Sequence, residues 1–407
     1  MYAAIAGLRT HMQNLNVIGH NIANVNTESY KSARSVFKTS IYSTTSGGSN
    51  GTEVAGGRNP SQIGYGSNLA SVDIDMSTGT YKVTGKSTDL MLDGDGFFLI
   101  GDKTISNNFT GGAEDVEALT SLTLTRLGAF DFGADGYLDA GGGNVVYGFL
   151  CTGVITREDY YVDPNAPEDQ LEVKEDMVGK KIGDPIFSDQ LVPIRFPRVQ
   201  TVTEYRDKDG KPVENADPDN LPEGVKPVEV TKIVYPQAEN GGHLTEDETL
   251  ERARFTGVTF DETTGMITAT SNDTKQIVTI GCLAVGSVTN PNGVTQIGNS
   301  NYKAGPGSGD LKIATLGGAA ESMGISYVNG SLRQADPDNP DAGQASIDGL
   351  RILYSPTTLK SNGLESSKAD LAQEIANMIV TQRGYQANTR IITVTDSMLE
   401  ELVNMKR

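Results

Sequence analysis

The chain has 407 residues, of which 37% are hydrophobic and 21% charged, and its formal net charge is -19 at pH 7. This acidic balance argues against a nucleic-acid partner, because a phosphate backbone is bound by clustered Lys and Arg side chains. The two cysteines, Cys151 and Cys282, exclude a disulfide framework, and no segment has the roughly 18 apolar residues of a membrane span.

Residues 1–25 predict the first helix. Apolar residues recur every seven positions, and a second series follows four positions after the first, as in a coiled coil. The two series are Met1, Leu8, Leu15 and Ile22, and Ile5, Met12 and Gly19. The segment lacks the basic start and the continuous apolar stretch of a secretory signal peptide. We therefore expect the chain to stay in the cytosol or to leave by a route that cleaves no signal.

The middle of the chain predicts β structure. Residues 39–66 are rich in Ser, Thr, Gly and Asn, which is typical of a linker or an irregular extended segment. Strand signals dominate from about residue 70 to about residue 360, where no convincing helix is expected. We predict turns at 134–136 and at the triple glycine 141–143, and hairpins across 261–265 and across 208–210.

The charge divides along the same lines. Residues 1–40 hold four basic residues and one acidic residue. Residues 364–407 hold five basic and six acidic residues. Nearly all of the excess negative charge therefore lies in the β-rich middle. This division favours a molecule that packs by its ends and exposes its centre to solvent.

The end of the chain predicts a longer helix, from about Glu365 to Asn404, with no proline after Pro356. A helix of this length measures about 60 Å at 1.5 Å per residue. Its seven-residue series is Leu364, Leu371, Met378, Tyr385, Ile392 and Leu399, with companions at Ile375, Gln382, Thr389, Asp396 and Val403. Six further apolar residues lie off this stripe and favour burial on more than one face, as in a packed array of subunits; they are Ile379, Val380, Ile391, Val394, Met398 and Leu402. The alternative is that the two terminal helices pair once, as a hairpin within a monomer.

The sequence offers no chemistry typical of an enzyme. The histidines at 11, 20 and 243 are scattered, and no nucleophile elbow, P-loop or zinc-protease motif is present. Two Asp/Gly-rich segments, 92–98 and 336–341, lack the glutamate that completes a calcium loop of the EF-hand type. We therefore expect neither an enzyme nor a bound cofactor or metal.

Six motifs resemble, in the same order, those of the bacterial flagellar rod and hook proteins. The first is "LRTHMQNLNVIGHNIANVNTESYKSARSVF", and the last is the C-terminal segment "GLESSKADLAQEIANMIVTQRGYQANTRIITVTDSMLEELVNMKR". Between them lie "GTEVAGGRNPSQIGYGSNLASV", "STDLMLDGDGFFLI", "TRLGAFDFGADGYLDAGGGNVVYGF" and "IGCLAVGSVTNPNGVTQIGNSNYKAGPGSG". A variable insert at about 151–280 resembles the extra outer domain of hook subunits, which the shorter distal rod proteins lack. A second insert separates these motifs at about 310–347.

The resemblance implies a mainly β fold with α-helical termini. The chain would leave a coiled-coil-like helical domain, build β-rich domains further out, and return. The domains would be a terminal helical domain of residues 1–35 with 364–407, and an extended linker at 36–70. An inner β domain of 71–150 with 281–363 and an outer β insert of 151–280 would follow.

The function that the resemblance implies is structural. Hook subunits polymerise into a curved, flexible tube, a universal joint that transmits torque from rod to filament. The implied partners are copies of the same chain, the distal rod protein, the hook cap, the hook–filament junction protein and the flagellar type III export apparatus. The expected location is the extracellular hook, reached without a cleaved signal peptide or membrane insertion.

Two groups of residues are predicted to act in assembly. The subunit-packing residues are Leu8, Leu15, Ile22, Leu371, Ile375, Met378, Tyr385, Ile392 and Leu399. The polar residues expected to bond between helices or to face the lumen of the tube are Asn21, Asn24, Asn26, Gln382, Arg383 and Asn388. For the asparagines, the alternative is a simple helix C-terminus, where asparagine tolerates the left-handed conformation.

The remaining expectations concern the cysteines and rival functions. We expect Cys151 and Cys282 to be buried, inert thiols, although some hook proteins link neighbouring subunits covalently through a cysteine and a lysine. Rival functions are another flagellar axial protein of the distal rod or junction type, and a cell-surface adhesin or surface-layer protein. A metal-dependent enzyme ranks last.

Overall fold

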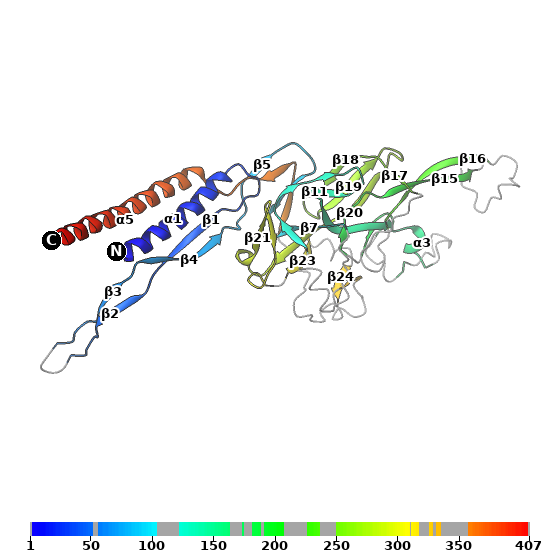
Figure 1. The fold of residues 1–407 in the computed structure, drawn as a ribbon. Helices are drawn as coiled ribbons and strands as arrows, with labels where there is room; N and C mark the ends of the chain where they lie inside the picture. Colours follow the sequence, from blue (N-terminus) through cyan, green and yellow to red (C-terminus); the bar gives the residue numbers. More distant parts are fainter. Residues whose placement is uncertain are drawn as a thin grey trace. The chain divides into compact units, whose positions relative to one another are not determined.

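The computed structural model describes residues 2–51, 56–103, 122–162, 173–174, 181–188, 191–206, 226–236, 250–309, 311–316, 325–328, 331–334 and 357–405. The chain forms two compact units, one made of residues 1–80 with 366–407 and the other of residues 81–365 (Figure 1). The described residues confirm the predicted fold class, which is mainly β with a helix at each end.

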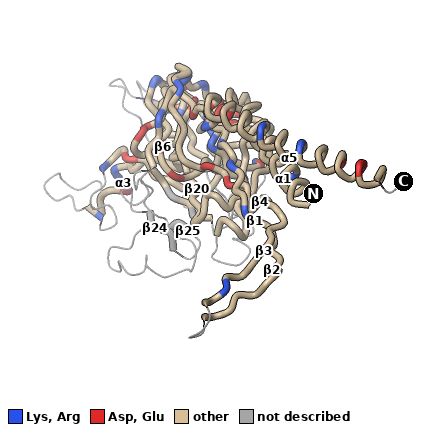
Figure 2. Tube along the Cα trace, turned by 90° about the vertical axis from the view of Figure 1, so that its left-hand side faces the viewer, with Lys and Arg blue, Asp and Glu red and all other residues tan. Residues whose placement is uncertain are grey.

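The first unit contains both long helices. Helix α1 (Tyr2–Ala23) and helix α5 (Leu371–Met405) run antiparallel, and the N- and C-termini lie at the same end of the pair (Figure 1). Long stretches of both helices carry no charged side chain (Figure 2). Within α1, Arg9 is the single Lys or Arg, and no acidic residue is present.

Helix α5 begins six residues later than predicted. Residues Gly363–Glu365 form strand β27 instead, which pairs with β5 (Tyr81–Val83), so Leu364 is a strand residue and does not belong to the helical stripe. The side chain of Asp370 accepts hydrogen bonds from the backbone N–H groups of Ala372 (2.9 Å) and Gln373 (3.4 Å). This N-cap satisfies the first free donors of the helix and fixes its start.

The segment predicted as a linker, 36–70, is not irregular throughout, because about half of its residues lie in two antiparallel strand pairs, which together we call the ribbon. Strand β1 (Ala33–Thr39) pairs antiparallel with β4 (Ser67–Ile74), and further out β2 (Tyr42–Ser46) pairs with β3 (Ser61–Gly64). The backbone N–H and C=O groups of each strand bond to those of its partner. A Ser- and Thr-rich sequence that lacks alternating apolar residues therefore still forms strands. The hydroxyl of Thr10 donates to the backbone carbonyl of Ser67 (2.9 Å) and ties α1 to this ribbon.

The second unit is built around a large antiparallel sheet. Its central order is β10-β11-β12-β20-β7-β8-β22-β21. The long strands β12 (Asn144–Val154) and β20 (Ile277–Val288) pair at its centre and are almost completely buried. The other strands on this path are β10 (Asp131–Phe132), β11 (Leu138–Gly141), β7 (Phe97–Gly101), β8 (Thr123–Thr125), β22 (Asn301–Lys303) and β21 (Thr295–Gly298).

Shorter strands extend this sheet or form small sheets beside it. Those that join it are β13 (Pro185–Phe187), β14 (Val192–Pro193), β18 (Phe255–Phe260), β19 (Met266–Ser271) and β23 (Leu311–Thr315). The others are β6 (Asp89–Asp93), β9 (Gly128–Ala129), β15 (Arg198–Arg206), β16 (Lys226–Val234), β17 (Glu251–Arg252), β24 (Ile325–Val328), β25 (Ser331–Gln334) and β26 (Thr358–Ser361). The core beneath them includes Leu90, Phe98, Phe130, Leu283 and Val285.

Two of the three predicted hairpin regions are confirmed. Strands β18 and β19 pair across 261–265, where the Asp261 carboxylate accepts from the backbone N–H groups of Thr263 and Thr264. Strands β10, β11 and β12 turn at 134–136 and at the three glycines, all of which have positive φ. The turn predicted at 208–210 lies outside the described residues, which show β15 paired with β16.

The expectation of no helix in the middle was wrong at two points among the described residues, which contain one turn of α-helix and the 3-10 helix η3 (Pro291–Gly293). A single helical turn, α3 (Arg157–Tyr160), begins at a capping box in which Thr156 and Asp159 bond to each other's backbone N–H groups. The predicted border between inner and outer β domains falls inside β12 and β20, and both strands continue across it. The division into inner and outer β domains stays a prediction.

Candidate assembly surface

The contact between α1 and α5 consists of small and polar residues at seven-residue steps. The Asn21 amide donates to the Glu374 carboxylate (2.9 Å), and the Asn14 amide donates to the Thr381 hydroxyl (2.9 Å). One further step along both helices, Gly7 faces Asn388. We call this contact the polar seam. It has the period of a coiled coil, but amides and hydroxyls replace the usual Leu residues.

Two glycines allow the helices to approach closely at the polar seam. A Cβ atom added at Gly7 would lie 2.8 Å from Nδ2 of Asn388, and one added at Gly384 would lie 2.7 Å from Cε1 of His11. Gly19, by contrast, has no neighbouring atom within 4 Å of such a Cβ. Gly7 and Gly384, and not Gly19, therefore lie where the two helices are close together.

Asn21 lies at the centre of a buried hydrogen-bond network and is only 1% exposed. Its Oδ1 accepts from the backbone N–H of Ala33 (3.0 Å), and its Nδ2 donates to the carbonyl of the same residue (2.8 Å). This pair of bonds fixes the orientation of the amide. Oδ1 also accepts from the Tyr30 hydroxyl (2.9 Å), while Nδ2 gives its second proton to Glu374.

The network ties the motif after α1 to the start of α5. Because the single hydroxyl proton of Tyr30 is donated to Asn21, the Nδ1 atom of His20, 2.8 Å from that oxygen, must be a donor. The carbonyl of Tyr30 accepts from the backbone N–H of Lys368 (3.0 Å). One amide thus joins α1, strand β1 and α5 in the same chain.

The other predicted polar residues have different surroundings. Asn24 donates to the carbonyl of His20 (2.9 Å) and accepts from the Thr27 hydroxyl (3.1 Å), so it completes the C-terminus of α1 and makes no side-chain bond between helices. Asn26, Gln382 and Arg383 are exposed, and Asn388 is half-buried at the polar seam. The helix-end alternative therefore describes Asn24, and the interhelical interpretation describes Asn21.

The predicted apolar stripe of α1 is not among the buried residues of that helix. Leu8, Leu15 and Ile22 are half-buried, and Ile5 and Met12 are exposed. The residues of α1 that are buried are Ala4, Gly7, Thr10, Ile18 and Asn21.

Helix α5 exposes most of its large apolar side chains. Among its described residues, Thr381 alone is buried, and Met378 and Ile392 are half-buried. We call the exposed set the apolar face of α5; it comprises Leu371, Ile375, Ile379, Val380, Tyr385, Ile391, Val394, Met398, Leu399, Leu402, Val403 and Met405. Exposed apolar surface of this extent on one element marks an interaction site.

The last turns of α5 extend past the start of α1. Since Gly7 faces Asn388 in an antiparallel pair, the first residues of α1 reach only as far as about Val394. Figure 1 shows the C-terminal end of α5 projecting beyond the N-terminus of α1. This overhang carries Met398, Leu402 and Met405, which are 57–78% exposed.

A second apolar surface, a groove beside α1, resembles the overhang in that its lining includes exposed apolar side chains. It is lined by Tyr2, Ile5 and Arg9 of the helix together with Tyr65 and Asn68 of the ribbon, and its volume is about 770 Å³. Tyr2, Ile5 and Tyr65 are exposed apolar side chains. The groove and the overhang are different surfaces of one chain, so a contact between them would join two copies head to tail.

The two cysteines are buried and free. Burial raises the pKa of Cys151 to about 11 and that of Cys282 to about 12. Both thiols are therefore protonated near neutral pH and poor nucleophiles. Among the described residues, no helix is long and apolar enough to cross a membrane, and no group of three or more His, Cys, Asp or Glu could hold a metal ion.

Comparison with known proteins identifies the class to which these terminal helices belong. The family model for flagella basal body rod protein matches residues 1–31, and the model for the C-terminal part of the flagellar basal body rod FlgEFG proteins matches residues 360–405. These ranges contain the whole of the polar seam and the apolar face of α5. The chain belongs to the family of flagellar basal-body rod and hook proteins.

Full-length relatives include hook and rod proteins. The chain is 26% identical to the flagellar hook protein FlgE of Borreliella burgdorferi, over 100% of this chain and 99% of the relative. It is 27% identical to the flagellar basal-body rod protein FlgG of Bacillus subtilis, over 100% of this chain and 98% of the relative. A crystal structure of Helicobacter pylori FlgE2 matches with a TM-score of 0.29 and 12% identity, over 70% of this chain and 100% of that one.

Proposed function

We propose that the chain is the structural subunit of the flagellar hook and that it polymerises into a curved, flexible tube between rod and filament. Family membership supports a part of the axial structure of the flagellum, and several relatives that match the full chain are hook proteins. The observation that carries the polymer is the apolar face of α5. Twelve large apolar side chains remain exposed after α5 has paired with α1 of the same chain.

The free energy of assembly would come from covering these side chains. Full burial of one Leu, Ile or Met side chain contributes roughly 1.5–3 kcal/mol. Covering a few of these side chains at each contact would offset the entropy that two subunits lose when they associate. The polar seam already provides the hydrogen bonds between α1 and α5 of one chain. The apolar side chains on the outer side of the helix pair are therefore available to contact neighbouring copies.

We infer that the polymer grows by contact between the overhang of one copy and the groove of the next, which makes the polymer open-ended. An overhang that enters the groove of the next copy leaves its own groove free, so growth continues. Charge supports the orientation, since the overhang carries Asp396, Glu400 and Glu401, whereas the groove contains Arg9. The partners at the two ends would be the distal rod protein and the junction protein, with a hook cap and type III export during growth.

The test is a deletion strain examined by electron microscopy, together with polymerisation of the purified chain. We expect rods without hooks in the deletion strain and pelletable tubes from the protein. Normal hooks in the deletion strain would contradict the proposal. The match to FlgG over the full chain favours a distal rod protein as the second candidate, and loss of the rod itself would support that function instead.

A further inference from the structure

The charged residues of α5 change sign along the helix (Figure 2). One of the six in its described part, Glu374, bonds to Asn21 of the same chain. The other five are exposed, and none of them forms an ion pair with another described residue; they are Arg383 and Arg390 in the middle of the helix, and Asp396, Glu400 and Glu401 in the overhang. A basic block is therefore followed by an acidic block, and both are open to another molecule.

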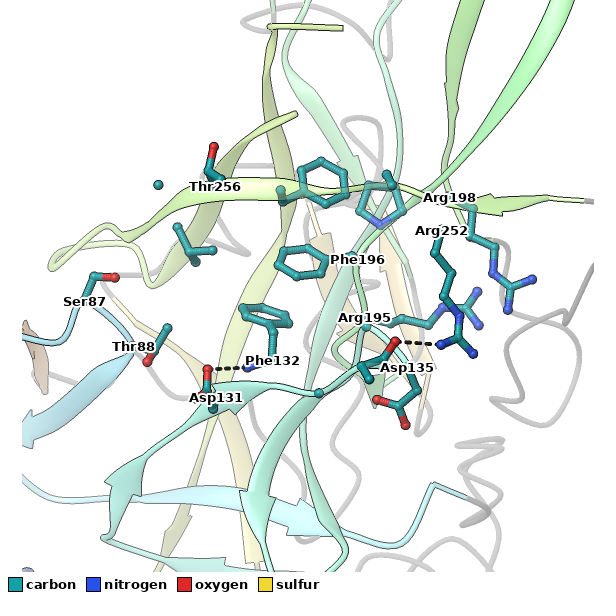
Figure 3. A pocket seen from close by; sticks show the side chains of 18 residues that line it. Ser87, Thr88, Asp131, Phe132, Asp135, Arg195, Phe196, Arg198, Arg252 and Thr256 are labelled. Atoms are coloured by element: carbon teal, nitrogen blue, oxygen red, sulfur yellow. Dashed lines mark hydrogen bonds between the residues drawn. The ribbon is translucent and has the colours of Figure 1, made fainter. Parts of the chain in front are cut away.

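A hollow of about 430 Å³ in the β-rich unit shows the opposite arrangement, because the charged side chains that line it have partners within the chain (Figure 3). The guanidinium group of Arg252 donates to the carbonyl of Ala134 (2.6 Å). Asp131 forms an ion pair with Lys86 (3.1 Å). The two charged blocks of α5 lack such partners among the described residues, so they, and not the charges of the hollow, are available to a neighbouring copy.

The two blocks lie on different faces of α5. Arg383 and Arg390 are seven positions apart and therefore share one face, which we call the arginine face. Asp396 and Glu400 are four positions apart and share another, the acidic face. At 3.6 residues per turn, the two faces are about 110° apart around the helix axis. The arginine face lies nearly opposite the polar seam and the acidic face about 80° from it, so neither is turned towards α1.

Exposed apolar side chains flank both charged faces. Ile379 and Val394 lie one turn before and one turn after the two arginines, and Val403 lies one turn after Glu400. A helix that packs on either face would cover these apolar side chains together with the charges. Water is then excluded from the charged groups, and pairs of opposite charge attract more strongly than they do in bulk water.

We propose that α5 helices of neighbouring copies lie side by side and parallel, with Arg383 and Arg390 of one copy paired to Asp396 and Glu400 of the next. The middles of the two blocks are about 11–12 positions apart, so the second helix would be shifted by about 17 Å along the axis at 1.5 Å per residue. The proposal rests on the proposed function, because it defines the register of a contact between subunits of the same polymer.

The separation of the two faces favours a parallel array over an antiparallel pair. An antiparallel pair would bring both blocks of each helix into one contact, which requires the arginines and the acids on a single face. A parallel contact joins the arginine face of one copy to the acidic face of the next, and it leaves one face of each kind free for further copies. Glu401 is turned by about 100° from Glu400 and stays available to Arg9 of the groove.

The experiment uses charge reversals in the full-length chain. One double variant carries Arg383→Glu and Arg390→Glu, a second carries Asp396→Lys and Glu400→Lys, and a fourfold variant carries all four changes. We expect each double variant to raise the critical concentration for polymerisation roughly tenfold or more, because like charges then meet at the contact. The fourfold variant should polymerise near the wild-type concentration, because exchange of both blocks restores every pair. An equal mixture of the two double variants should do the same.

The control variant carries Lys226→Glu and Lys303→Glu, which change the net charge as much as the arginine reversals do, at exposed positions of the β-rich unit. Every variant keeps Lys406 and Arg407, which follow the described residues, and thermal melts verify the fold. Double variants that match the control would overturn the inference, and so would a fourfold variant no better than the double variants. If wild-type chains fail to polymerise at all, the proposed function is what fails.

Discussion

Replacement of Asn21 by Leu should disrupt the helical unit severely, although the two side chains have similar volumes. The buried amide makes four hydrogen bonds, to the Ala33 N–H and carbonyl, the Tyr30 hydroxyl and the Glu374 carboxylate. Leucine supplies none of them. Each buried polar partner left unsatisfied costs about 1–3 kcal/mol, and part of that cost is recovered where water reaches Glu374. A total loss of about 3–5 kcal/mol in the free energy of unfolding follows.

Asn24 is the matched control, because it lies three residues away and its amide bonds are local and near the surface. We expect Asn24→Leu to cost about 1 kcal/mol or less, as for loss of a surface hydrogen bond at a helix end. Denaturant unfolding followed by far-UV circular dichroism measures both variants. Export followed by failure to form hooks is expected for Asn21→Leu only. Equal stability of the two variants would refute the assignment of Asn21 as the centre of the network.

Three further predictions concern the helices and the thiols. Leu399→Asp should leave the monomer as stable as wild type but prevent sedimentable polymer, since Leu399 is exposed until a neighbour covers it and a buried, unpaired charge costs several kcal/mol; tubes of normal yield would contradict this. Gly7→Ala should lower the stability of the helix pair by about 1–3 kcal/mol, because the added methyl group clashes with Asn388 of the facing helix. Gly19→Ala should raise that stability by about 0.5–1 kcal/mol, because the space around Gly19 is open and alanine favours the helix. Thermal melts measure both changes. Cys151 and Cys282 should resist a thiol-specific reagent at neutral pH until the chain is unfolded. Their pKa values are raised in the folded state, so the unfolded chain loses these protons first as the pH rises. The free energy of unfolding should therefore fall as pH rises from 9 towards 11, measured by denaturant titration.

The sequence predicted the elements better than their contacts. Period-seven spacing identified both terminal helices, and the Asp–Gly and triple-glycine turns located the strands around residues 131–154. The start of α5 was misplaced because the stripe continued smoothly through Leu364, while the backbone there pairs with β5. Only the N-cap at Asp370 marks the true start, and an aspartate six residues beyond Leu364 is a weak signal by itself.

The sequence could not show which partner covers the apolar side of each terminal helix. Periodicity shows that a helix has an apolar side, but it does not show whether that side meets the same chain or another copy. The large residues Leu8 and Leu15 lie one position from Gly7 and Asn14, which form the true seam. A signal was nevertheless present, since the glycine and asparagine of α1 and the threonine and asparagine of α5 share the seven-residue period.

Two chemically distinct surfaces on one helix explain how a subunit can be both ordered and able to assemble. Hydrogen bonds at the polar seam are directional, so Asn21 and Asn14 specify one register of α1 on α5. Apolar contacts are not directional, and their side chains can shift against neighbours with small loss. A tube whose subunits must move past one another benefits from this division, because bending changes the apolar contacts between copies while the polar seam keeps each helix pair intact.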